Sequence, residues 1–104
     1  MPINPNSGSE ISLQEAQKLV TNFRSKFPKE IKAAFVGIET LNLILKQSDC
    51  IGVRIYNGYD ATLGVMTPVL VGVDAAGKDI ASGVILDRLK LCPEFCDTSS
   101  PLNK

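Results

Sequence analysis

The chain has 104 residues, of which 44% are hydrophobic and 21% are charged. This length fits one domain, and the hydrophobic content is enough for a folded core, so a disordered chain and a collagen-like repeat are excluded. Apolar runs such as residues 69–73 are far shorter than the roughly 20 residues of a membrane-spanning helix. We therefore expect no membrane partner.

Basic and acidic residues number 11 each, so the formal net charge is zero. The basic residues are scattered along the chain, whereas nucleic-acid binding needs a basic surface, so we expect no nucleic-acid partner. Histidine is absent, which removes the Ser–His and Cys–His catalytic arrangements. A net charge near zero also gives little repulsion between copies, so it does not oppose self-association.

Residues 1–10 contain two prolines, two asparagines, two serines and a glycine. This composition predicts a flexible tail, followed by a single globular domain over residues 11–104. The tail has neither the basic segment nor the apolar segment of a secretory signal peptide. We therefore expect a cytoplasmic protein, in a compartment that keeps thiols reduced.

A helix is predicted to begin directly after the tail. Ser12 and Glu15 form the S-x-x-E pattern of a capping box. Apolar residues then recur at helical spacing and form one stripe, made of Leu13, Ala16, Leu19, Val20, Phe23 and Phe27. Pro28 ends the helix, because the residue before a proline avoids the helical region.

The next segment is open to two interpretations. Residues 31–36 are short and apolar, and Gly37 interrupts them. We favour a short strand over residues 31–36, followed by a helix from about Glu39 to Gln47. A helix throughout is the alternative.

Two strands are predicted in the middle of the chain. Residues 50–56 alternate between apolar and other side chains, which is typical of a half-buried strand. Asn57-Gly58 predicts a turn, and residues 59–66 lack alternation and are expected to form a loop. Residues 69–73 predict a buried central strand, with Pro68 just before it.

The segment after this strand predicts a hairpin. Asp74 to Gly77 has the composition of a type I turn, and residues 79–86 are expected to return as a third strand, weakened by Gly83. The predicted fold class is therefore α+β: a small antiparallel meander of about three to four strands, with two helices packed on one face.

Three groups of polar residues are candidate sites, and for each of them ordinary structure is the favoured interpretation. Residues 72–79 nearly match a phosphate-binding loop, but Asp79 stands where a hydroxyl should hold magnesium. Asp74, Asp79 and Asp60 could hold a hard cation, but solvated turn carboxylates are the favoured interpretation. Arg54 lies beside Tyr56 on the polar face of its strand, where a solvated face is favoured over an ion pair or an anion contact.

The most distinctive segment is Cys92-Pro93-Glu94-Phe95-Cys96. Pro93 suits the first position of a helical turn with Cys92 as its cap, and such a turn would place the two cysteine Cα atoms about 6 Å apart. A disulfide or a redox site is then possible.

A zinc site is the other chemical interpretation of the cysteines. Cys50, Cys92 and Cys96, together with Asp97 or Asp49, provide enough ligands for tetrahedral zinc. The favoured interpretation is that Cys50 is a small core residue and that the other two cysteines are structural or incidental. No catalytic or cofactor-binding residue is assigned, and zinc is the one cofactor considered.

Several of these segments together resemble those of a group of short uncharacterised bacterial proteins. They are residues 52–56 (GVRIY), residues 69–79 (VLVGVDAAGKD), the CPEFC segment and the final SPLN of residues 100–103. The second residue after the first cysteine is often proline in that group and is Glu94 here. The resemblance covers residues 11–103 and implies a bacterial cytoplasmic protein, with no substrate, cofactor or catalytic residue.

Three functions follow from these observations. The preferred hypothesis is a non-enzymatic binding or assembly module that associates with itself or with another protein, because exposed strand edges can pair between copies. The second is a thiol-based redox or zinc-binding protein that uses Cys92, Cys96 and Cys50. The third is a small enzyme that uses lysine or carboxylate chemistry in the loop of residues 57–66.

Overall fold

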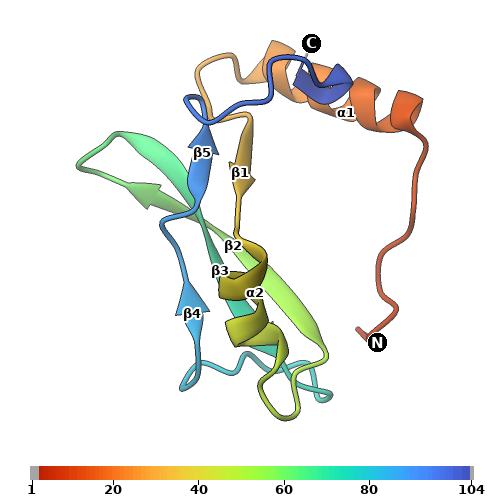
Figure 1. The fold of residues 1–104 in the computed structure, drawn as a ribbon, viewed down its shortest axis with the longest axis vertical. Helices are drawn as coiled ribbons and strands as arrows, with labels where there is room; N and C mark the ends of the chain where they lie inside the picture. Colours follow the sequence, from red (N-terminus) through yellow and green to blue (C-terminus); the bar gives the residue numbers. More distant parts are fainter. Residues whose placement is uncertain (1–2, 104) are drawn as a thin grey trace.

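The computed structural model describes residues 3–103 and has the predicted α+β fold (Figure 1). Its elements, in chain order, are α1 (Leu13–Lys26), β1 (Ala33–Phe35), α2 (Ile38–Leu45), β2 (Gly52–Asp60), β3 (Val65–Val73), β4 (Ile85–Leu86), β5 (Lys90–Cys92) and the short 3-10 helix η1 (Pro101–Asn103). No helix among the described residues is long and apolar enough to cross a membrane.

Strands β2, β3 and β4 form the predicted antiparallel meander. Strands β2 and β3 pair along their whole length, from Gly52 opposite Val73 to Asp60 opposite Val65. Strand β4 adds only two residues, which pair with Leu70 and Val71. The predicted third strand over residues 79–86 is thus reduced to β4 and one isolated bridge at Asp79.

The prediction of a turn at Asn57-Gly58 is wrong. Both residues lie inside β2, where Asn57 pairs with Pro68, which itself lies inside β3 and not before it. The expected loop of residues 59–66 is correspondingly shorter, since only residues 61–64 lie outside the two strands. Continuous pairing with β3 outweighs the local turn preference of an Asn-Gly pair, because each added residue pair extends the hydrogen-bonded ladder.

The real β2–β3 turn has its own local stabilisation. Asp60 Oδ1 accepts hydrogen bonds from the backbone N–H groups of Thr62 and Leu63 at 2.9 and 3.0 Å. Gly64 has a positive φ of 70°, which glycine adopts without steric cost. An aspartate and a glycine thus make this turn, as they do in the predicted turn at residues 74–77.

That second turn is confirmed. The N–H of Gly77 donates to the carbonyl of Asp74 at 2.9 Å. The Asp74 carboxylate also accepts from the N–H groups of Ala76 and Lys78. This local pattern of an initial aspartate and a final glycine needs no distant contact, so it could be recognised in the sequence.

A second sheet contains two short strands. The predicted strand over residues 31–36 is observed as β1, and it pairs antiparallel with β5, with Ala33 opposite Cys92. Strand β5 was not predicted, because three residues are too few for a periodic pattern. Figure 1 shows this pair at one end of the meander, next to α1.

Both predicted helices are present. The capping box begins α1, with the Glu15 N–H donating to Ser12 Oγ at 3.1 Å and the Ser12 N–H donating to the Glu15 carboxylate. Helix α2 packs against β2 and β3, whereas the main contact of α1 is with η1. The structure therefore does not show the predicted packing of both helices on one face of the sheet.

The core of the described residues lies where α2 crosses β3. Ile44 of α2 is fully buried, and Leu70, Val71 and Val73 of β3 are nearly so. Gly72 allows this close approach, because a Cβ atom there would lie 3.1 Å from Cys50 Sγ and 3.3 Å from Ile44 Cγ2. The apolar run of residues 69–73 thus provides the central strand that was predicted from its composition.

Candidate functional site

Cys92 and Cys96 form a disulfide, with their Cα atoms 4.8 Å apart. The predicted helical turn is absent, since Cys92 ends strand β5 and residues 93–95 form a turn instead. The N–H of Phe95 donates to the carbonyl of Leu91 at 2.9 Å and closes this turn. A disulfide that closes such a short loop stabilises the fold by only about 2 kcal/mol in the chain-entropy account.

The disulfide lies in the wall of a cavity of about 270 Å³. The cavity is open to solvent on one side and is lined by α1, by the β1–β5 pair and by the C-terminal segment of residues 95–103. Its lining includes Val20, Lys32, Phe95 and both disulfide cysteines. Cys92 is only 5% exposed, whereas Cys96 is half-buried, so the two cysteines differ in their exposure to solvent.

The C-terminal segment connects the disulfide to α1. Gln17 Nε2 donates to the carbonyl of Pro101 at 3.2 Å, and Arg24 Nη1 donates to the carbonyl of Leu102 at 2.9 Å. Asp97 organises the same segment by accepting hydrogen bonds from the N–H and the hydroxyl of Ser99. The hydrogen bonds from Ser99 lower the pKa of the Asp97 carboxyl, because they stabilise its charged form.

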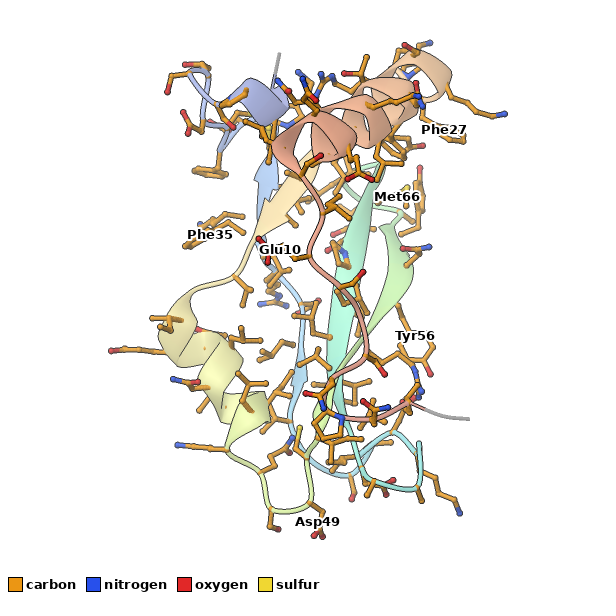
Figure 2. The ribbon with its side chains drawn as sticks, turned by 90° about the vertical axis from the view of Figure 1, so that its right-hand side faces the viewer. Glu10, Phe27, Phe35, Asp49, Tyr56 and Met66 are labelled. Carbon is orange, nitrogen blue, oxygen red and sulfur yellow. A yellow bond between two sulfur atoms is a disulfide. The ribbon has the colours of Figure 1, made fainter. Side chains whose placement is uncertain are left out.

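The third predicted thiol lies elsewhere. Cys50 is free, and its Sγ contacts the carbonyl oxygen of Gly52 at 3.2 Å on the core side of β2. Its neighbour Asp49 lies at the opposite end of the molecule from α1 (Figure 2). The structure therefore joins two of the three predicted cysteines and separates Cys50 from them. Within residues 3–103, no group of three or more His, Cys, Asp or Glu side chains could hold a metal ion.

A polar cluster lies on β2. The Asp79 carboxylate accepts hydrogen bonds from Arg54 and from the hydroxyl of Tyr56, and it forms an ion pair with Arg54. The solvated face favoured from the sequence is thus an ion pair that joins residues 25 positions apart. Alternation along β2 placed Arg54 and Tyr56 on one face, but no local signal identified Asp79 as their partner.

Hydrogen bonds within the cluster shift the pKa values of its members. The hydrogen bond from Tyr56, followed by that from Arg54, lowers the pKa of the Asp79 carboxyl despite partial burial. The same bond to Asp79, together with burial, raises the pKa of the Tyr56 hydroxyl. Both carboxylate oxygens of Asp79 are engaged, so the cluster suits a structural tie between β2 and the residues after the turn better than a general base.

Apolar side chains are widely exposed. Helix α1 has no buried residue, although its stripe has the spacing of a core-facing helix. The exposed large apolar residues of the elements include Leu13, Leu19 and Phe23 of α1 and its C-cap residue Phe27, Phe35 of β1, Ile38, Leu43 and Leu45 of α2, and Ile55, Tyr56 and Tyr59 of β2. Figure 2 shows Phe35 projecting away from its strand.

No family model, no curated protein and no solved structure matches the chain. Two features of the described residues are therefore the basis for a function. One is the disulfide beside its cavity. The other is the exposed apolar surface.

Proposed function

We propose that this protein is a non-enzymatic assembly module that associates with a second copy of itself. The proposal rests on the accessible surface area of the chain. The chain has an accessible surface of 7780 Å², whereas a compact monomer of this mass has about 5,700 Å². The excess is roughly 2,000 Å², and exposed apolar side chains contribute to it.

The shape of the chain is consistent with this excess. Its radius of gyration is 15.2 Å, compared with about 13 Å for a compact domain of 100 residues. Figure 1 shows α1 projecting from the end of the β1–β5 pair, with residues 3–10 descending from its far end. These elements are held to the rest of the protein by few contacts, so much of their surface faces solvent.

The excess accessible surface is consistent with burial against a second copy of the chain. Obligate homodimers bury about 2,000 to 5,000 Å² in total, or half of that on each chain. An excess of roughly 2,000 Å² on each chain lies within this range. A formal net charge of zero also keeps electrostatic repulsion between two copies small.

We place the contact surface on the apolar stripe of α1. The C-terminal segment covers only one side of the helix, where Gln17 and Arg24 bond to it. Leu19 remains 61% exposed, and Phe23 and Phe27 are also exposed. An amphipathic helix gains most of its stability from burying such a stripe, and a second copy supplies the missing surface.

Sedimentation velocity over a micromolar to submillimolar range tests this proposal. We expect the unaltered protein to be a dimer and Leu19→Glu to be a folded monomer, because the carboxylate would be buried in the contact. Gln14→Glu adds the same charge on the opposite face of α1 and should remain dimeric. A monomeric unaltered protein at every concentration, or a dimer that tolerates Leu19→Glu, would overturn the proposal.

A further inference from the structure

We propose that the Cys92–Cys96 disulfide is a thiol–disulfide exchange site, and that its substrate is a low-molecular-weight thiol entering through the adjoining cavity. This inference does not depend on self-association. It rests on the disulfide in the cavity wall, on the unequal exposure of its two cysteines and on the charges around it.

The cavity allows a small ligand to reach the disulfide. Its volume of about 270 Å³ is close to the lower end of the range for small-molecule sites. Val20 and Leu102 provide apolar walls, and Lys32, Asp97 and Ser100 provide polar ones. A site of this size suits a small thiol and not a folded protein partner.

The unequal exposure of the two cysteines indicates which sulfur is attacked. Cys92 is buried at the end of β5, whereas Cys96 lies after the turn and is only half-buried. An incoming thiolate must reach the sulfur it attacks, so it approaches Cys96. Cys92 is then the leaving group and remains inside the cavity wall.

The charges near the site are mixed. Lys32 lines the cavity, and Lys90 Nζ lies 5.0 Å from the centre of the Phe95 ring. These cations favour the approach of a thiolate and of the carboxylate groups that small thiols often carry. Asp97 has the opposite charge, but the N–H and hydroxyl of Ser99 already bond to its carboxylate.

The exchange balances in two steps. A substrate thiolate attacks Cys96 Sγ, so the Cys92–Cys96 bond breaks and a mixed disulfide forms on Cys96, while Cys92 leaves as a thiolate and takes a proton from solvent. A second substrate thiolate attacks the substrate sulfur of the mixed disulfide and releases Cys96. The protein gains two electrons and two protons, and two substrate thiols are oxidised to one disulfide.

The folded protein has other bonds that hold this region when the disulfide opens. Lys32 N–H donates to the carbonyl of Cys92 at 2.6 Å, and Phe95 N–H donates to the carbonyl of Leu91. Strand β1 remains paired with β5.

The test uses reduced glutathione as the probe, with Cys50→Ser as the background so that only the two site cysteines react. The folded protein is treated with limiting glutathione, trapped with iodoacetamide and mapped by peptide mass spectrometry. We expect glutathione on Cys96 and carbamidomethyl on Cys92. A disulfide that opens only in denaturant, or glutathione on Cys92, overturns the inference.

Matched single-thiol variants provide a second measurement. In the same background, Cys92→Ser leaves Cys96 free and Cys96→Ser leaves Cys92 free. Oxidised glutathione should modify the Cys92→Ser protein on the order of tenfold faster, because its thiol is accessible in the folded state. Circular dichroism confirms that both variants are folded, and equal rates in two folded variants contradict the proposed direction of attack.

Discussion

Gln47 Oε1 accepts a hydrogen bond from the backbone N–H of Val84 at 2.9 Å, joining residues 37 positions apart. Its Nε2 donates to the carbonyl of Ile44 at 3.1 Å. One amide side chain thus ties the end of α2 to the segment that leads into β4. Both bonds are partly buried, so water replaces them poorly when the side chain is removed.

We predict that Gln47→Ala lowers the free energy of unfolding by about 1–2 kcal/mol, since it leaves the Val84 N–H without its partner. Urea denaturation measures the change. Gln17→Ala is the matched control, because its amide also bonds to a distant backbone group, the carbonyl of Pro101, but does so at the surface. Its effect should stay within about 0.5 kcal/mol, and equal losses in the two variants would contradict the prediction.

Gly72→Ala should destabilise the protein by about 1–3 kcal/mol, because the core around this residue is overpacked by an added Cβ. The new atom would lie 2.9 Å from Gln47 Nε2 and 3.1 Å from Cys50 Sγ. Gly52→Ala is the control in the neighbouring strand, where nothing lies within 4 Å of the added atom. Thermal and urea denaturation should show Gly52→Ala to be neutral or slightly stabilising.

The Asp79 cluster predicts a loss of stability in acid. The folded pKa of Asp79 lies below its unfolded value, chiefly because Tyr56 and then Arg54 bond to the carboxylate. The contribution of Asp79 to the free energy of unfolding is therefore complete above its unfolded pKa, and it is lost as pH falls through its folded pKa. The urea midpoint should fall as the solution is acidified from neutral pH.

Asp79→Asn identifies the group responsible for this pH dependence. The variant should be less stable than the unaltered protein at neutral pH, and the difference should shrink in acid, because the unaltered carboxyl is then protonated too. Asp87→Asn, at an exposed position, serves as the control. A difference between the Asp79 variant and the unaltered protein that does not change with pH would rule out the linkage.

Reduction of the Cys92–Cys96 disulfide should lower the free energy of unfolding by about 2 kcal/mol and leave the protein folded. Urea denaturation of the oxidised and reduced forms gives this difference directly. Cys96→Ser should match the reduced form, since both lack the same crosslink. Loss of the far-ultraviolet circular dichroism spectrum on reduction would show that the bridge is essential to the fold.

Local signals in the sequence correctly predicted several elements. The capping box of Ser12 and Glu15 and the apolar stripe that follows specify α1. Asp74 and Gly77 specify their turn through bonds between residues close in the chain. These features were predictable because the interactions that form them lie within a few residues of one another.

Other features depended on contacts between distant segments. The Asn57-Gly58 pair favours a turn locally, but its pairing with residues of β3 places it inside a strand. Strand β5 forms by pairing with β1. Its three residues are too few to show a strand-like alternation in the sequence. Asp79 belongs with Arg54 and Tyr56 only because the hairpin brings them together.

Composition and short-range periodicity encode the α+β class, helix α1 and the buried strand of residues 69–73, so these features can be recognised in the sequence. The pairing of Cys92 with Cys96, the separate position of Cys50 and the exposure of the α1 stripe depend on how distant segments pack. Hydrophobic burial is non-directional, so an apolar stripe does not specify what covers it.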